Sequence, residues 1–210
     1  MINVVIADDH PIVRAGLKQI IMQDDGIAVT GEASTGAELL EKVRHARYDV
    51  ILLDLTMPGM DGLDVLKQLK IETPDTPVII LTIHPESQYA LRILRAGASG
   101  YLTKESASER LIEAIHKVFR GGKYITPSLA EKIAYALDAD AAKAPHEALS
   151  DREYQVLCLI GSGKTVSQIA DALALSVKTV STYRTRILEK MHMENNAELI
   201  HYAVQNALVD

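Results

Sequence analysis

The sequence lacks the features that mark secreted and membrane proteins. It has one cysteine in 210 residues, Cys158, which excludes a framework of internal disulfides. The apolar neighbours of Cys158 favour a small buried core residue over a reactive thiol. No apolar run approaches the roughly 20 residues that a membrane-spanning helix needs, and the first residues show no basic stretch or cleavage-like site of a signal peptide. We therefore expect a cytoplasmic protein without a membrane partner.

An excess of basic residues is also missing. The chain has 22 Lys+Arg against 28 Asp+Glu, a formal net charge of −6, which argues against a surface that is basic throughout for nucleic acid. Hydrophobic residues make up 48% and charged residues 24% of the chain, the balance of a folded protein rather than a disordered one. The length exceeds the commonest domain size of about 100–150 residues, which favours two domains.

Short apolar runs alternate with amphipathic segments over residues 1–125. The strongest runs are rich in β-branched residues and lack polar alternation, which is typical of strands covered on both faces. The segments between the runs have helical spacing, and Pro11 suits the first turn of the first of these helices. We therefore predict a doubly wound α/β domain with a five-stranded parallel sheet. The predicted strands lie at residues 4–7, 27–33, 50–53, 78–81 and 98–102.

The pattern changes after residue 125. Thr126-Pro127 can start a helix over 128–137, and the alanine-rich segment that follows has almost nothing to bury. We predict a helical or flexible linker over 126–148; alternatively, its alanines extend the preceding helix. Residues 149–210 are predicted to form an all-α domain of four helices. These helices are expected to begin at Ser150, Thr165, Ser176 and Asn195.

Polar residues stand where the first, third, fourth and fifth predicted strands end. In an open parallel sheet, these ends form one edge, at which ligands bind. Three converging carboxylates repel one another unless a cation compensates them, and oxygen ligands of this kind suit Mg²⁺. Each aspartate alone can instead cap a helix, but five polar groups after four strands favour a shared site. The five residues are Asp8, Asp9, Asp54, Thr82 and Lys104.

These residues lie in motifs that resemble the receiver domain of two-component response regulators. The motifs are Ala-Asp-Asp-His-Pro at 7–11, Leu-Leu-Asp-Leu-Thr-Met-Pro-Gly-Met-Asp-Gly at 52–62, Leu-Thr at 81–82 and Gly-Tyr-Leu-Thr-Lys at 100–104. The resemblance covers residues 1–125 and implies a flavodoxin-like sheet with strand order 2-1-3-4-5. It also implies a phosphoryl donor, a phosphohistidine on a partner histidine kinase.

The resemblance implies a role for each residue of the acidic site. Asp54 is the implied phosphoryl acceptor, and Thr82 and Lys104 bind the phosphoryl oxygens. Tyr101 is the implied switch residue, whose ring rotates inward when Thr82 moves towards the phosphoryl group; alternatively, it is a packing aromatic. The implied Mg²⁺ ligands are Asp8, Asp9, the Asp54 carboxylate and the main-chain carbonyl of Thr56.

The predicted helix at 176–191 meets the requirements of a DNA-reading helix. It follows a short helix and a tight turn, as a helix-turn-helix motif needs. Its four basic residues against one acidic residue give a balance of +3, although residues 149–210 have six basic and seven acidic residues in all. A cationic helix face is otherwise often only a solvated surface. The expected core residues of this helix are Val177, Val180, Ile187, Leu188 and Met191.

The helical half resembles the LuxR-type, four-helix DNA-binding domain. The resemblance rests on Leu-Ser-Asp-Arg-Glu-Tyr-Gln-Val-Leu from 149, Gln-Ile-Ala-Asp-Ala-Leu from 168 and the whole of 176–191. With the receiver, it makes the chain similar to the NarL/FixJ class of response regulators. The implied DNA contacts are Lys178, Thr179, Thr182, Tyr183 and Arg186. The fourth helix often forms the dimer face on DNA in this class, and the residues that either form this face or pack the core are Leu199, Tyr202, Ala203 and Ala207.

We therefore expect a phosphorylation-controlled transcription regulator rather than an enzyme. Its expected partners are a histidine kinase, promoter DNA and a second copy of the chain, on DNA or when phosphorylated, with RNA polymerase as a further candidate. A Mg²⁺-dependent phosphatase is one alternative, but the sequence shows no separate acid or base beside Asp54. A phosphorelay or protein-interaction module is another, and salt-dependent binding to promoter DNA would exclude it.

Overall fold

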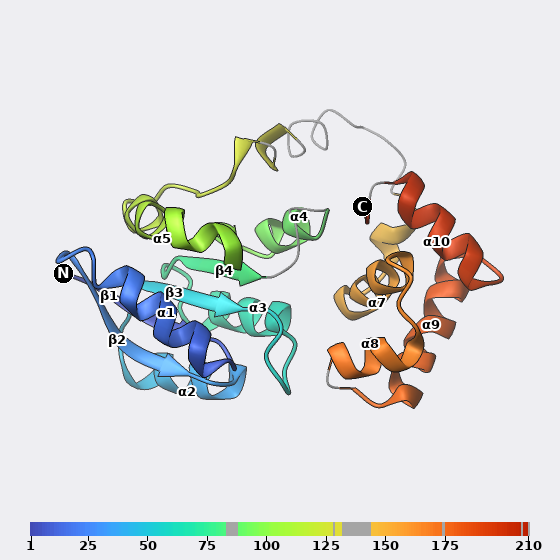
Figure 1. Cartoon of the computed structure of the whole chain (residues 1–210), viewed down its shortest axis with the longest axis horizontal. Helices are drawn as coiled ribbons and strands as arrows, with labels where there is room; N and C mark the ends of the chain where they lie inside the picture. The colour runs from blue at the N-terminus through green and yellow to red at the C-terminus, as the bar shows by residue number, and fades with distance from the viewer. Residues whose placement is uncertain (83–87, 128, 132–143, 174, 207, 210) are drawn as a thin grey trace. The chain divides into compact units, whose positions relative to one another are not determined.

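Two compact units make up the chain, one formed by most of residues 1–131 and the other by most of residues 132–210. The computed structural model describes residues 1–82, 88–127, 129–131, 144–173, 175–206 and 208–209. Each unit is described separately below (Figure 1). None of the described helices combines the length and the apolar character that crossing a membrane requires.

The first unit contains a five-stranded parallel sheet in the order β2-β1-β3-β4-β5. Strands β3 and β4 are buried along their whole length, as expected for unbroken apolar runs in a parallel sheet. The flavodoxin-like sheet and its strand order are therefore confirmed. The strands are β1 (Ile2–Ala7), β2 (Ile27–Ala33), β3 (Val50–Asp54), β4 (Val78–Thr82) and β5 (Gly100–Thr103).

Helices cover both faces of this sheet, with α1 and α5 packed beside each other in front of it and α3 behind it in Figure 1. The core beneath α1 and α5 takes every second strand residue, including Val4, Ile6 and Leu102. Pro11 is in the first turn of α1, as predicted. The helices are α1 (Pro11–Ile21), α2 (Gly36–His45), α3 (Gly62–Glu72), α4 (Gln88–Arg95) and α5 (Lys104–Phe119).

Several strand boundaries differ from the prediction. β1 begins at Ile2 rather than at residue 4, β4 ends at Thr82 rather than at residue 81, and β5 ends at Thr103 rather than at residue 102. Asp54 is the last residue of β3 rather than the first residue after it, and β5 begins at Gly100 rather than at residue 98. Sheet pairing decides these last two ends, because Asp54 pairs with Leu81 and Gly100 pairs with Ile79. An apolar run shows that a strand is buried but not where its neighbour stops.

The second unit is all-helical, as predicted, and side chains cap its helices at the predicted positions. Ser150 and Thr165 each form a capping box, with Glu153 and Gln168 respectively, and Ser176 and Asn195 accept hydrogen bonds from the main chain of their own helices. Cys158 is half-buried rather than fully buried. The elements are the 3-10 helix η1 (Pro145–Ala148), α7 (Asp151–Gly161), α8 (Val166–Ala172), α9 (Val177–Met191) and α10 (Asn196–Gln205).

The described ends of the predicted linker 126–148 are packed into the two units, which the linker prediction did not foresee. At one end, the Thr126 hydroxyl accepts a hydrogen bond from the main-chain N–H of Leu129 (3.3 Å), and the Leu129 side chain is fully buried. At the other end, His146 in η1 is buried, with Nδ1 2.7 Å from the Tyr202 hydroxyl on α10. One leucine and one histidine make these contacts, and the alanine-rich composition of the segment does not reveal them. The rest of the predicted segment, 132–143, lies outside the described residues.

Candidate functional site

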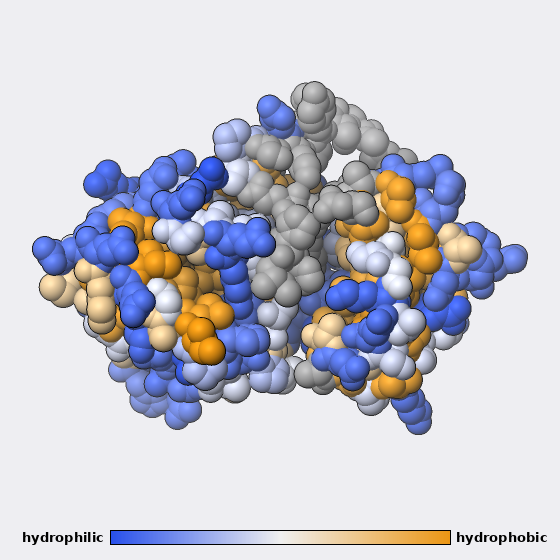
Figure 2. All heavy atoms as spheres, viewed as in Figure 1, coloured by the Kyte–Doolittle hydropathy of each residue, from blue (hydrophilic) through white to orange (hydrophobic). Residues whose placement is uncertain are grey.

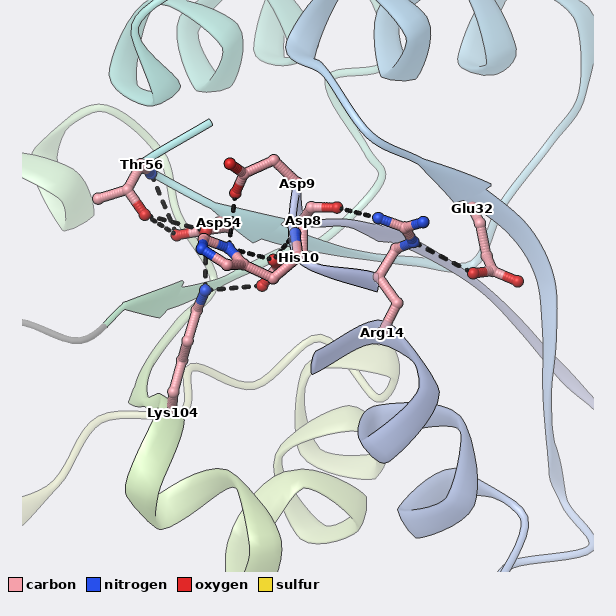
Figure 3. Close-up of polar contacts among 8 residues, drawn as sticks. All are labelled: Asp8, Asp9, His10, Arg14, Glu32, Asp54, Thr56 and Lys104. Atoms are coloured by element: carbon pink, nitrogen blue, oxygen red, sulfur yellow. Dashed lines mark hydrogen bonds and ion pairs between the residues drawn. The ribbon is translucent and has the colours of Figure 1, made fainter. Parts of the chain in front are cut away.

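Two aspartates are buried at the edge where β1 and β3 end. Asp8 follows β1 directly and Asp54 ends β3, and both have side chains that are 0% exposed. A buried carboxylate is stable only when hydrogen bonds or a cation compensate its charge. Figure 3 shows that the side chains that do so converge on this point from several elements.

Lys104 supplies the cation from the first residue of α5, directly after β5. Its Nζ lies 2.7 Å from Asp8 Oδ2 and 2.8 Å from Asp54 Oδ2. Burial alone lowers the pKa of Lys104, but its hydrogen bonds with Asp54 and Asp8 outweigh burial, and the net pKa is raised above the ordinary lysine value. The ammonium group therefore stays charged between the two aspartates.

Thr56 supplies further hydrogen bonds to the Asp54 carboxylate. Its main-chain N–H donates to Asp54 Oδ1 at 3.1 Å, and its hydroxyl lies 2.9 Å from Oδ1 and 3.0 Å from Oδ2. The hydroxyl has one proton and so donates to one of these oxygens at a time. These contacts orient the Asp54 carboxylate in the site.

The Asp9 carboxylate and the His10 ring complete the cluster. His10 Nδ1 lies 2.8 Å from Asp9 Oδ1 and 3.2 Å from Asp8 Oδ1, and the His10 main-chain N–H donates to Asp8 Oδ1 at 2.8 Å. One ligand atom each of Asp8, Asp9, His10 and Asp54 lies within 4.8 Å of the others. Three carboxylates against one lysine leave a net negative charge in an oxygen-rich site, and this donor set fits a hard divalent cation such as Mg²⁺.

The sequence interpretation missed His10. It gave the imidazole no role and saw no acid or base beside Asp54, although His10 belongs to the cluster. The available signal was position, since His10 directly follows the two aspartates. It also missed Arg14, whose Nη1 donates to the main-chain carbonyl of Asp8 at 2.6 Å.

Thr82 and Tyr101 are both fully buried near this edge of the sheet. Thr82 ends β4, one residue beyond the partner of Asp54, and Tyr101 pairs with Ile80 on the neighbouring strand. Leu102 belongs to the core beneath α1 and α5, so the Tyr101 side chain lies on the opposite face of the sheet. Their roles in phosphoryl binding and switching stay predictions.

Helix α9 presents the predicted cationic face to solvent. Lys178, Thr182 and Arg186 are exposed, and Thr179 and Tyr183 are half-buried. Arg184 is turned away from this set, because its Nε donates to the Asn196 side chain at the start of α10. The basic side chains Lys178 and Arg186 therefore face solvent, whereas Arg184 makes a structural contact within the unit.

The predicted core of α9 is right at its centre and wrong at its start. Val180, Ile187 and Met191 are buried and Leu188 is half-buried, but Val177 is 51% exposed. Helical periodicity identifies which face is covered but not how far along the helix the covering neighbours extend. The buried part of this face of α9 begins at Val180.

Helix α10 buries most of the residues named for its dimer face. Leu199 and Ala203 are fully buried, Tyr202 is half-buried against His146, and Ala207 lies outside the described residues. The core-packing alternative therefore holds for Leu199 and Ala203. The exposed apolar residues are instead Ile200 (36%) and Val204 (55%), one helical turn apart. Figure 2 shows hydrophobic side chains at the surface where Figure 1 places α10.

Two protein-family models match the chain, one on each unit. The model described as a response regulator receiver domain matches residues 4–116. The model described as bacterial regulatory proteins of the luxR family matches residues 147–203.

Similarity to characterised proteins extends over nearly the whole chain. It is 37% identical to the response regulator UvrY of Escherichia coli (strain K12) over 99% of this chain and 96% of UvrY. It is 39% identical to the response regulator GacA of Pseudomonas protegens over 100% of this chain and 99% of GacA. Among solved structures, RcsB from Salmonella enterica serovar Typhimurium, bound to the promoter rprA with the phosphomimetic BeF3⁻, is similar with a TM-score of 0.65 and 28% identity. That likeness covers 96% of this chain and 97% of the RcsB chain.

Proposed function

The chain belongs to the NarL/FixJ class of two-component response regulators, phosphorylation-controlled DNA-binding regulators of transcription, and we propose that Asp54 is its phosphoryl acceptor. The observation that carries this proposal is the arrangement around Asp54. Its carboxylate is fully buried, is oriented by Thr56 and lies 2.8 Å from the Lys104 ammonium group. A nucleophile held this way needs no large rearrangement before it reacts.

The transfer itself breaks one bond and forms one. An oxygen of the Asp54 carboxylate attacks the phosphorus of a phosphohistidine on the partner kinase, and the P–N bond breaks with its electron pair left on the imidazole nitrogen. Lys104 neutralises charge on the phosphoryl oxygens, and we assign the Thr82 hydroxyl the same task from β4. Positioning and charge neutralisation of this kind supply most of the catalysis in phosphoryl transfer, because its transition state is loose.

We assign a Mg²⁺ ion to the same cluster. The residues that would hold it are Asp8, Asp9, Asp54 and the main-chain carbonyl of Thr56. A bound Mg²⁺ supplies positive charge to the phosphoryl oxygens in addition to that of Lys104. The buried carboxylates support this assignment, because one lysine leaves the cluster negatively charged.

Tyr101 is the residue to which we assign the conformational switch. Its ring is fully buried on the strand next to Thr82, which agrees with the inward position implied for the switched state. Movement of Thr82 towards the phosphoryl group changes the space available to this ring, and a buried ring responds to such a change because cores are closely packed.

We propose that α9 reads promoter DNA through Lys178, Thr179, Thr182, Tyr183 and Arg186. Exposed basic and hydroxyl side chains at the start of a helix suit both base edges and phosphates of the major groove. A dimer places two such helices on half-sites about one helical turn apart. RNA polymerase is a further candidate partner at the promoter.

We propose a receiver domain over residues 1–125 and a DNA-binding domain from 149 to 210, joined by the segment 126–148 with η1 attached to the second domain. A protein that binds promoter DNA acts where the bacterial chromosome lies, so we assign it to the cytoplasm.

We also propose that the protein regulates transcription and does not turn over substrates. Steady hydrolysis of small phosphate esters such as p-nitrophenyl phosphate would contradict that assignment.

The test of the phosphoacceptor is Asp54→Asn in the full chain. The variant is expected to take up no phosphoryl group from a phosphorylated histidine kinase or from acetyl phosphate, as measured by phosphate-affinity electrophoresis. The DNA probe is a duplex selected from a random library by the phosphorylated wild type. Treatment with the phosphodonor should raise the affinity of wild type for this duplex, but not that of Asp54→Asn. Asp64→Asn, an exposed aspartate in the first turn of α3, is the matched control and should behave as wild type. A gain in DNA affinity that survives in Asp54→Asn would refute the proposal.

A further inference from the structure

The main chain of Asp8 is held on both sides by atoms outside the acidic cluster. The Asp8 main-chain N–H donates to the carbonyl of Ala33 on β2 at 3.1 Å. The Asp8 carbonyl accepts a hydrogen bond from Arg14 Nη1 at 2.6 Å. Arg14 lies in the first turn of α1, and its guanidinium points back at the main chain of the aspartates that precede the helix (Figure 3).

Glu32 holds the Arg14 guanidinium in this position. Arg14 Nε donates to Glu32 Oε2 at 3.2 Å, and the Arg14 side chain is only 17% exposed. Glu32 lies on β2 beside Ile6, and Lys18 Nζ binds its second oxygen at 2.6 Å. Lys18 first and then Arg14 hold the pKa of Glu32 below its ordinary value, so the carboxylate stays ionised at neutral pH.

Asp9 depends on this main-chain support more than Asp8 does. The Asp8 carboxylate is buried and held by Lys104 and by the His10 main chain. The Asp9 side chain is 27% exposed, and its one ion pair within the described part of the chain is with His10, which is 60% exposed. Because the peptide unit is planar, a fixed Asp8 carbonyl also fixes the N–H and the Cα of Asp9.

We infer that Arg14, clamped by Glu32, is a positioning residue that sets the main chain between the two aspartates and thereby the affinity of the cluster for a divalent cation. Arg14 touches neither the ion nor the phosphoryl group; it acts through the Asp8 carbonyl. The inference rests on the metal site proposed above. Partners that orient metal ligands in this way commonly change metal affinity by about 10–100-fold when they are removed.

The test measures metal binding directly, without phosphorylation. Mn²⁺ is titrated into the full chain, and the free ion is followed by electron paramagnetic resonance. Arg14→Gln is expected to raise the dissociation constant about tenfold. Lys18→Gln is the matched control. Like Arg14→Gln, it removes one positive charge from α1 and one contact to Glu32, but Arg14 and not Lys18 donates to the Asp8 carbonyl. The Lys18→Gln variant should stay within about twofold of wild type, since the Lys18 ammonium group binds Glu32 and not the main chain of the aspartates.

Two outcomes would overturn the inference: wild-type affinity in Arg14→Gln, or an equal loss in Lys18→Gln, which would assign the effect to net charge. Glu32→Gln is the second variant, used alongside in case Arg14→Gln does not fold. It keeps Arg14 but removes its clamp, so it should weaken Mn²⁺ binding in the same direction. Unchanged binding by Glu32→Gln would remove the clamp from the inference.

A kinetic readout separates positioning from a general loss of structure. Phosphorylation by acetyl phosphate is measured over a range of Mg²⁺ concentrations. In Arg14→Gln the half-saturating Mg²⁺ concentration should rise about tenfold, while the rate at saturating Mg²⁺ stays near that of wild type. A lower rate with unchanged half-saturation would mean a structural role only. If wild type itself neither binds Mn²⁺ nor accepts phosphate, the proposed function fails; if wild type does both, only the Arg14 inference is under test.

Discussion

Buried carboxylates in both units are each held by a lysine from a distant part of the chain. Asp54 has Lys104, and Glu153, which is 3% exposed, has Lys190 with Nζ at 2.6 Å from Oε2. Glu153 also accepts a hydrogen bond from the main-chain N–H of Ser150, so one side chain joins the start of α7 to the end of α9. Such residues contribute to stability mainly through the cost of leaving their partner unpaired.

Glu153 makes the stability of the helical unit depend on pH. Burial raises the pKa of its carboxyl, but the hydrogen bonds from Lys190 and Ser150 outweigh burial, and the net pKa lies below the ordinary value of 4.5. The ionised form therefore stabilises the folded state above pH 4.5, and this stabilisation is lost as the pH falls through the lowered value. We expect Glu153→Gln to lose about 1–3 kcal/mol at pH 7.

The measurement is the unfolding free energy from urea titrations at pH 7, 5 and 4. The difference between wild type and Glu153→Gln should shrink towards the acid end. Glu194→Gln, an exposed glutamate of the same unit, is the control and should change little at any of these pH values. Equal stability of wild type and Glu153→Gln at pH 7 would contradict the assignment.

Helix α9 is the element on which DNA affinity should depend. Its two ends are fixed by different means: the Ser176 hydroxyl caps its start, and His192 in the left-handed region, with φ of 55°, ends it. Val180, Ile187 and Met191 anchor one face in the core. The main chain of the opposite face is therefore held rigidly, so binding costs the freedom of its exposed side chains but not that of the backbone.

Lys178→Ala tests this face. We expect DNA affinity to fall by about 1–3 kcal/mol, or about 5–150-fold, because one positive contact at the groove is lost. Arg184→Gln is the matched control on the same helix, since Arg184 binds Asn196 rather than facing solvent. Fluorescence anisotropy of labelled duplex DNA at two salt concentrations measures both. Equal binding by Lys178→Ala and wild type would remove α9 from the interface, and an equal loss in Arg184→Gln would assign the effect to net charge.

At the scale of the whole molecule, the charge distribution limits how one copy can bind DNA. The formal charge of −6 divides into −3 for residues 1–125, −2 for 126–149 and −1 for 150–210, and the local excess of basic residues that we propose for DNA binding lies on α9. One basic helix neutralises few phosphates, and affinity rises steeply when two copies bind together. We therefore propose dimerisation as the step at which phosphorylation acts on DNA binding.

Val204→Asp tests whether the exposed apolar residues of α10 form the dimer contact. A carboxylate buried in an apolar contact is unfavourable, so affinity for duplexes with two half-sites should fall at least about tenfold. Affinity for a single half-site should not change. Gln205→Asp adds the same charge at the neighbouring exposed position of α10 and is the control. Sedimentation equilibrium on DNA measures the stoichiometry, and dimeric binding by Val204→Asp would place the contact elsewhere.

The class of fold and most helix starts followed from the sequence, because they depend on local properties. Unbroken β-branched runs identified buried parallel strands, and Ser, Thr and Asn residues identified helix starts through hydrogen bonds that span only three residues. The site was partly predictable for the same reason: its acidic residues lie at the end of a strand or directly after it. Positions such as Val177 were not predictable, since exposure depends on neighbours that come from elsewhere in the chain.

The sequence by itself determined which chemical groups stand at the strand ends and on α9, because motif spacing and strand periodicity are written along the chain. The tertiary structure decided which of those groups meet. Lys104 bridges Asp8 and Asp54 although it lies 50 residues beyond Asp54. Glu32 on β2 binds Arg14 on α1. His146 binds Tyr202, which is 56 residues away in the chain. The physical reason is that charge pairing and burial depend on distance in space, which only the packing of strands and helices sets.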